Sequence, residues 1–345
     1  MIWELEKKQD EAKIKKLQEE LNVSRLVSVL LLNRNIDSFD KAKGFFRPSL
    51  DDLHDPFLMQ DMQQAVDRIQ KAINDNENIL VFGDYDVDGT TSVSLVSSFL
   101  NNHTKNNVLT YIPDRYKEGY GISTKSIDYA ASKEINLIIA LDCGIQAVNK
   151  VEYAKEKNID FIICDHHRPS KEIPKAIAVL NPLREDCQYP YKELCGCGIG
   201  FKLIQALSDI MGETTGSIKE YLDLVALAIV ADIVSLTGEN RILCYYGLQQ
   251  INQSPRPGLK AIIDTLDKDN ITINELGFYI GPRINAAGRM ESGNIAVELL
   301  IEKDLGKASG LAEKLNQLNI ERRVLDKETT QDALKQIKKF KNETS

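Results

Sequence analysis

The sequence predicts an α/β protein in which a parallel β-sheet is covered by helices. Between residues 79 and 180, short apolar runs alternate with amphipathic segments. Near-continuous apolar runs of this length are typical of strands that are buried on both faces of a parallel sheet. The predicted strands span 79–82, 108–112, 137–141, 161–164 and 176–180, and helices are expected over 93–101, 123–132 and 147–157 between them.

The composition is that of an ordinary globular protein. The 345 residues are enough for about two domains, and 43% of them are apolar while 27% are charged. A formal net charge of −8 argues against a broad basic surface for nucleic acid, although it leaves room for a local one. The six cysteines include no Cys-x-x-Cys pair, so a zinc knuckle is not expected.

No feature of the sequence predicts a membrane protein or a secreted one. The chain has no apolar run of about 18 residues, so we expect no transmembrane helix. Its N-terminus lacks the apolar core and the cleavage site of a signal peptide. These observations predict a cytoplasmic location.

Helical patterns flank the predicted sheet on both sides. Helices are expected over 4–21, 23–32 and 62–74. A final long helix is predicted because apolar residues recur at helical spacing. They are Leu305, Ala308, Leu311, Leu315, Leu318, Val324 and Leu325. The predicted divisions are an N-terminal helical segment (1–45), the main α/β domain (46–240), its helical remainder (241–303) and the long helix (304–345).

An acidic turn follows the first predicted strand. Asp84, Asp86 and Asp88 occupy alternate positions there, and such carboxylates repel one another unless a cation offsets their charge. An EF-hand calcium loop is excluded, because its twelfth position would be Leu95 rather than a glutamate and a strand precedes it. The stretch 86–90 also matches the opening motif of haloacid-dehalogenase phosphatases, with Asp86 as nucleophile, and this interpretation remains open at this point.

More potential metal ligands follow the other predicted strands. Asp142 comes directly after the third strand, Asp165-His166-His167 after the fourth, and Asp232 after a predicted helix over 221–230. In open parallel sheets, ligands bind beyond the carboxyl ends of the strands. Carboxylates combined with imidazoles suit Mn²⁺ or Mg²⁺. These side chains exceed the needs of one ion, which favours a two-metal site for in-line attack on phosphorus.

Taken together, these motifs resemble the DHH phosphoesterase family, which is named for the Asp-His-His triplet at 165–167. Four motifs match in order: 84–92, Asp142, 165–167 and Asp232. Within the family, the chain is similar to bacterial exonucleases that degrade single-stranded DNA in the 5′→3′ direction. The stretches that carry this closer likeness are 112–121, 231–241 and 281–289. The resemblance removes the dehalogenase alternative, since that family has no use for an Asp-His-His triplet.

The resemblance implies roles for individual residues. Six side chains would hold two Mn²⁺ or Mg²⁺ ions: Asp84, Asp86, Asp88, Asp142, His166 and Asp232. Asp142 would bridge the ions and act in catalysis with His166 and His167, the last as a phosphate contact or as support for the ligands. Contacts to substrate phosphate would come from Arg289, Arg283, Asn285 and Arg115. The implied activity releases mononucleotides from single-stranded DNA in repair and recombination, with a helicase or a single-strand-binding protein as partner and no membrane.

One departure from the family pattern concerns a second domain. The resemblance implies a DHHA1 domain with a Gly-Gly-His motif, whereas this chain contains no Gly-Gly pair. We therefore expect the catalytic half alone, with a substrate groove that is open on one side. Two alternatives remain, namely a DHH phosphodiesterase for short oligonucleotides or cyclic dinucleotides, and a non-catalytic scaffold. The Cys-Gly-Cys-Gly stretch at 195–198 is expected to be structural, because its glycines permit close approach at the start of a helix over 199–207.

Overall fold

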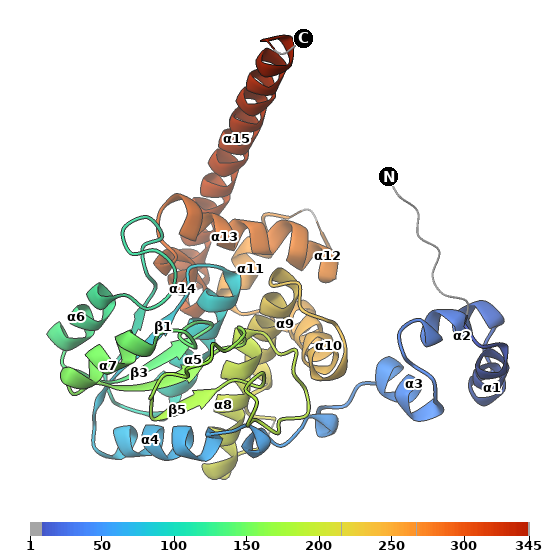
Figure 1. Cartoon of the computed structure of the whole chain (residues 1–345), viewed down its shortest axis with the longest axis horizontal. Helices are drawn as coiled ribbons and strands as arrows, with labels where there is room; N and C mark the ends of the chain where they lie inside the picture. Colours follow the sequence, from blue (N-terminus) through green and yellow to red (C-terminus); the bar gives the residue numbers. More distant parts are fainter. Residues whose placement is uncertain (1–8, 215, 267, 344–345) are drawn as a thin grey trace. The chain divides into compact units, whose positions relative to one another are not determined.

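The computed structural model describes residues 9–214, 216–266 and 268–343. The chain divides into two compact units, residues 1–53 and 54–345 (Figure 1). The smaller unit contains α1 (Glu11–Leu21), α2 (Arg25–Leu32), α3 (Phe39–Phe46) and a 3₁₀ turn (Leu50–Asp52). Ile14, Leu17 and Leu31 are buried in its core. The first helix begins at Glu11, because Asp10 caps its N-terminus: the Asp10 carboxylate accepts a hydrogen bond from the Ala12 amide. The predicted earlier start was therefore wrong for residues 9 and 10, while its residues 4–8 lie outside the described part.

A five-stranded parallel sheet forms the centre of the larger unit. Its strands are β1 (Asn78–Gly83), β2 (Val108–Tyr111), β3 (Ile135–Leu141), β4 (Asp160–Cys164) and β5 (Ala178–Leu180). They lie in the order β2-β1-β3-β4-β5. The order reverses between β1 and β3, and in such sheets ligands bind in the crevice at that switch point. All five strands lie within two residues of their predicted bounds, so the α/β prediction with a parallel sheet is confirmed.

Helices cover both faces of this sheet (Figure 1). On one face, α6 (Thr124–Ser132) and α7 (Val148–Glu156) bury apolar side chains such as Ile127 and Val151 against β1, β3 and β4. The other face is covered by α5 (Val87–His103) and α8 (Gly196–Ile210), which are almost wholly buried. Outside these helices lie α4 (Met62–Asn74), α9 (Leu222–Ala231) and α10 (Gly238–Gln253).

The rest of the larger unit is helical as well. It contains α11 (Pro257–Ile263), α12 (Ile273–Glu275), a π-helical turn (Leu276–Ile280), α13 (Gly281–Met290), α14 (Asn294–Ile301) and α15 (Leu305–Glu343), and two 3₁₀ turns lie earlier in the unit (Pro56–Leu58 and Lys219–Tyr221). The predicted long C-terminal helix is confirmed. Its first part packs against α11, α13 and α14 and buries Ala308, Ala312 and Leu315. Over the described residues, no helix is both long and apolar enough to cross a membrane.

Candidate metal centre

The register of the sheet brings the predicted ligands to one edge. Gly83 of β1 pairs with Leu141 of β3, and Leu141 pairs with Cys164 of β4. The next residue of each strand is an aspartate: Asp84, Asp142 and Asp165. Three carboxylates from different parts of the sequence therefore meet at the switch point between β1 and β3.

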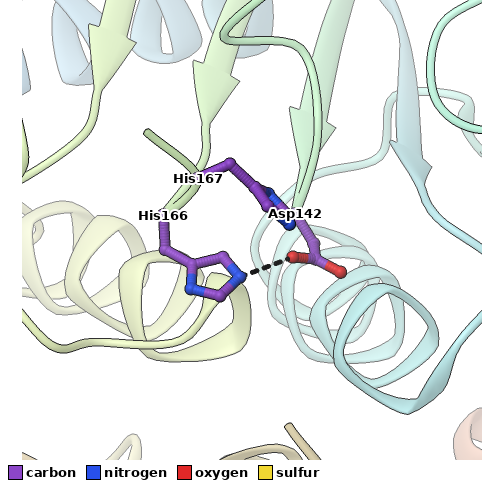
Figure 2. Close-up of side chains that lie close together, drawn as sticks. All are labelled: Asp142, His166 and His167. Carbon is purple, nitrogen blue, oxygen red and sulfur yellow. Dashed lines mark ion pairs between the residues drawn. The ribbon is translucent and has the colours of Figure 1, made fainter. Parts of the chain in front are cut away.

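His166 lies at the centre of the site. Its Nε2 atom is 3.2 Å from Asp142 Oδ1 (Figure 2), 3.7 Å from Asp232 Oδ2 and 3.8 Å from Asp88 Oδ2. Two groups of potential ligands overlap at this histidine. One is Asp142, His166 and His167, and the other is Asp88, His166 and Asp232, with ligand atoms within 4.8 Å of one another in each group. Carboxylate oxygens and imidazole nitrogens are donors that Mn²⁺ and Mg²⁺ accept.

Burial and mutual repulsion raise the pKa values of these carboxyl groups. Burial, followed by the charge of Asp86, raises the pKa of Asp84 to about 7. Burial, followed by the charge of Asp88, does the same for Asp232, whose pKa is about 7. The pKa of Asp142 rises well above its usual value for the same two reasons. A divalent cation would offset both effects, because its positive charge stabilises buried carboxylates and screens their repulsion.

Two orphaned carboxylate oxygens show that the residues present fit such a cation. Within the described part of the chain, the buried Oδ1 atoms of Asp84 and Asp142 accept no hydrogen bond, although His166 Nε2 lies 3.2 Å from that of Asp142. A buried charged oxygen without a partner is costly, and a hard cation is the partner that carboxylates of this arrangement favour. The donor set therefore fits the divalent metals that the sequence predicts.

The start of α8 holds Asp88 in place. Backbone N–H groups of Gly196 and Cys197 donate to the Asp88 carboxylate at 2.6 and 2.8 Å. A Cβ atom on Gly196 would lie only 2.6 Å from the Cβ of Asp142, so the two segments approach this closely only with glycine there. The helix begins at Gly196 rather than at residue 199 as predicted, because these amides point at a carboxylate and the first turn is thereby satisfied.

Asp86 acts first as a helix cap. Its Oδ1 atom accepts a hydrogen bond of 3.0 Å from the Gly89 amide, so α5 begins at Val87. The prediction that this helix starts at residue 93 was wrong. Hydroxyls of Thr90, Thr91 and Ser92 bond to backbone carbonyls one turn earlier, which lets a polar stretch form a buried helix. Asp84 and Asp86 lie outside both three-residue ligand groups, although the charge of Asp86 helps to raise the pKa values of Asp88 and Asp142.

Asp165 orients His167, and sequence reasoning did not assign it this role. Asp165 Oδ1 lies 2.7 Å from His167 Nδ1, while Asp165 Oδ2 accepts a 2.8 Å hydrogen bond from the Ile145 amide. This contact raises the pKa of His167. The opposite ring nitrogen lies 3.4 Å from the Tyr120 hydroxyl. The sequence signal that could have revealed this role is the Asp-His-His triplet. A histidine that acts on phosphate or metal needs an acceptor for its other ring nitrogen, and Asp165 is the nearest acidic residue in the sequence.

The backbone that carries two of the ligands is unusual. Asp142 has φ 58° and Ile233, directly after Asp232, has φ 60°. Aspartate tolerates this left-handed region, whereas a β-branched residue there is an outlier. Ile233 is also 88% exposed. Such conformations concentrate at functional sites.

The predicted phosphate contacts come from α13 and from the loop after β2, and they do not all face the site equally. Asn285 Oδ1 accepts a 3.2 Å hydrogen bond from the Val87 amide and so supports the acidic turn. Arg283 donates instead to Asn316 of α15 at 3.1 Å. Arg115 lies over the ring of Tyr85, with its Cζ atom 5.1 Å from the ring centre. Arg289 is held through its backbone carbonyl, which accepts a 2.8 Å hydrogen bond from Tyr116.

Comparison with known proteins places the chain in a family. Residues 78–229 match the model of the DHH family, N-terminal domain. The chain is 40% identical over 339 residues to the single-stranded-DNA-specific exonuclease RecJ of Bacillus subtilis. The aligned region covers 98% of this chain and 42% of that protein. It spans about half the length of the curated relatives it matches.

Solved structures agree with the sequence comparison. A crystal structure of exonuclease RecJ bound to manganese is 30% identical, with a TM-score of 0.75 over 81% of this chain and 70% of that one. RecJ of Thermus thermophilus in complex with Mn²⁺ is 27% identical, with a TM-score of 0.81 over 95% of this chain and 47% of that one. With the four motifs assembled at the sheet edge, these matches show that the chain belongs to the DHH family and, within it, to the RecJ branch.

Proposed function

We propose that this chain is a metal-dependent exonuclease that degrades single-stranded DNA in the 5′→3′ direction and releases mononucleotides, in DNA repair and recombination. The observation that carries the proposal is the intact ligand set around His166 in a chain 40% identical to an exonuclease of that specificity. An intact set also argues against a non-catalytic scaffold. The likeness to a protein named as a single-stranded-DNA-specific exonuclease favours a polynucleotide substrate over a dinucleotide.

Two divalent cations, Mn²⁺ or Mg²⁺, would be held by the six predicted ligands. Those residues are Asp84, Asp86, Asp88, Asp142, His166 and Asp232. Crystal structures of RecJ proteins in complex with Mn²⁺ and with Mg²⁺ support this choice of metal. When bound, the cations would supply charge neutralisation for the phosphodiester and a nucleophile at neutral pH. Asp142 is almost wholly buried in the site and would contact both.

The chain's own residues would orient the substrate and move protons. His167, held by Asp165 at Nδ1, presents Nε2 toward the reacting phosphate and donates a hydrogen bond to its oxygen. Arg115 and Arg289 both lie close enough to Tyr85 to act on its pKa, and they would bind neighbouring phosphates. Arg283 would act there only after it leaves Asn316, so we place it behind the other two. Asn285 would act by positioning Val87 at the acidic turn.

The location and the partners follow from the proposed substrate. We assign the activity to residues 46–303, with the long helix 304–345 as an extension of this core. Single-stranded DNA arises when a helicase unwinds a duplex, and it is covered by single-strand-binding protein. We therefore propose that the chain acts in the cytoplasm, where such DNA occurs, beside one of these proteins.

A degradation assay tests the proposal. The full chain with Mn²⁺ is given a long 5′-phosphorylated single strand, the matching duplex and the same strand labelled at its 3′ end. We expect mononucleotides from the single strand and none from the duplex. Asp142→Ala should abolish release, whereas Asp269→Ala, which changes an exposed carboxylate away from the site, should not. A wild-type chain that binds two Mn²⁺ ions and leaves the single strand intact would refute the activity.

A further inference from the structure

A cavity of about 330 Å³ opens beside the metal centre, and none of the roles described above places a part of the substrate in it. Two turns form its walls, Tyr120–Ile122 after β2 and Gly144–Ala147 after β3, and Lys150 of α7 lies at its rim. His167 and Asp165 close the side that faces the metal ligands. Because His167 belongs both to this wall and to a ligand group, the cavity lies one side chain away from the reacting phosphate.

The lining has the chemistry of a site for one nucleobase. Ile122 and Ile145 supply apolar surface, the Tyr120 ring supplies an aromatic one, and Gln146 supplies an amide that can donate or accept. Ligand cavities commonly combine apolar walls with a few polar groups, and bases of single strands stack on aromatic rings irrespective of sequence. The volume lies at the low end of the roughly 300–1,000 Å³ range of ligand cavities. One unpaired base fits such a space.

Lys150 gives the cavity a free cation. Lys157 of the same helix region pairs with Asp128 at 3.4 Å, whereas Lys150 makes no ion pair within the described part of the chain. The one carboxylate in the cavity wall, Asp165, already accepts hydrogen bonds at both oxygens. An ammonium group at the rim of a cavity whose one carboxylate already accepts hydrogen bonds suits the phosphate that a bound base carries with it.

We propose that this cavity is a subsite for the unpaired base of a nucleotide next to the scissile phosphate, and that Lys150 binds the phosphate of that nucleotide. The proposal rests on the nuclease function proposed above and deepens it. A base must leave its partner to enter the cavity, so the subsite itself selects single strands, as in enzymes that take a base out of the stack. The specificity for single strands then comes in part from residues 120–150 and does not require a second domain.

The first experiment measures binding, so it does not depend on cleavage. The full chain with Mn²⁺ is titrated with a fluorescent single strand whose 5′ linkages are phosphorothioates, and anisotropy is recorded. Strands with an abasic site at the first or the second 5′ nucleotide are compared with the intact strand. We expect an abasic site at one of these positions to weaken binding roughly 5- to 150-fold, the range for loss of one stacked base. Equal affinity for all three strands would overturn the proposal.

Two variants locate the effect in this cavity. Ala147→Trp fills the cavity and should weaken binding of the intact strand, yet leave the strand with the critical abasic site unchanged. Lys150→Met should flatten the dependence of log K on log salt by about 0.7, the contribution of one phosphate contact on a single strand. Lys155→Met, an exposed lysine of the same helix outside the cavity, is the matched control and should change neither quantity. An unchanged salt slope in Lys150→Met would overturn the role of this lysine.

Folding and the proposed activity are monitored separately. Each variant should keep the wild-type Mn²⁺ affinity and thermal midpoint, and Lys150→Met remains informative if Ala147→Trp does not fold. Hydrolysis of bis(p-nitrophenyl) phosphate, which has no base, reports the proposed activity separately and should be the same in Lys155→Met and in the wild type. If the wild type cleaves neither this ester nor DNA, the nuclease proposal fails while the anisotropy result still decides the subsite.

Discussion

Replacement of Gly196 by alanine tests how tightly the metal centre is built. The added Cβ atom would lie 2.6 Å from Asp142 Cβ and 2.9 Å from Asp142 Oδ1. Real Cβ atoms essentially never approach this closely, so α8 or Asp142 must move by several tenths of an ångström. Any movement of α8 also displaces the two amides that hold Asp88.

The expected magnitudes follow from this geometry. Overpacking in a rigid interior costs about 1–3 kcal/mol, which urea denaturation of the metal-free chain would report. Ligands displaced from their supports lose about 10- to 100-fold in metal affinity, which Mn²⁺ titration by electron paramagnetic resonance would report. Gly196 has an ordinary helical backbone, so strain at the glycine itself does not contribute.

Gly310→Ala is the matched control. Gly310 lies in α15, and a Cβ atom there would have no neighbour within 4 Å. This variant should be more stable than the wild type by up to about 1 kcal/mol, because alanine favours a helix over glycine. Its Mn²⁺ affinity should not change. If Gly196→Ala binds Mn²⁺ as tightly as Gly310→Ala does, the close approach does not constrain the ligands and the reasoning is refuted.

Three further predictions concern the ligands and a fourth a buried ion pair. Asp165→Asn removes the charged partner of His167, so we expect strand cleavage to fall about 10- to 100-fold while the Mn²⁺ affinity stays the same. Full activity of this variant across the pH range would contradict the role of Asp165 in orienting His167. Mn²⁺ at about 100 times its Kd should stabilise the chain by about 2.7 kcal/mol in calorimetry, and EDTA should abolish the gain. In the metal-free state near neutral pH, Asp142→Asn should be more stable than the wild type in urea denaturation, because it removes a carboxyl group whose charged form is disfavoured by burial and by the charge of Asp88. A less stable variant would count against this explanation. Lys202→Met leaves Glu239 buried without its cation. It should lower the free energy of unfolding by about 3–5 kcal/mol in urea denaturation and leave Mn²⁺ binding unchanged. A loss below about 1 kcal/mol would mean that the Tyr189 hydroxyl and the His54 amide suffice as partners of Glu239.

The sheet was predictable because its signals are local. Each strand is a short run of apolar residues, and the ligands follow these runs directly, so their meeting at one edge required only the rule that parallel strands end together. The starts of α5 and α8 were not predictable in this way. Both depend on a carboxylate that accepts backbone hydrogen bonds, and for α8 that carboxylate, Asp88, lies 108 residues away from Gly196 in the sequence.

The contrast between local signals and distant contacts also explains what could be predicted of Arg283 and Arg289. Arg283 and Arg289 lie in a stretch with several small residues at 281–289, which together with the family resemblance predicted phosphate contacts. The direction of each side chain depends on the packing of α13 against α15 and against the acidic turn. Arg283 and Arg289 are six residues apart in α13 and point to different surroundings, because a helix of about 3.6 residues per turn places them on different faces. No pattern in the sequence encodes that a partner such as Asn316 lies beside one of them.

The spread of the ligands along the chain has a consequence for folding. Asp84, Asp142, His166 and Asp232 come from four separate segments. The assembled parallel sheet brings Asp84 and Asp142 to one edge, and His166 lies there close to Asp142 and to Asp232, which follows α9. The unfolded chain therefore has no preformed site, and any fragment that ends before residue 232 lacks part of it. Metal uptake should occur after the slow, non-local step of folding and should not template it. The rate at which Mn²⁺ becomes bound during refolding would then report the formation of the whole sheet.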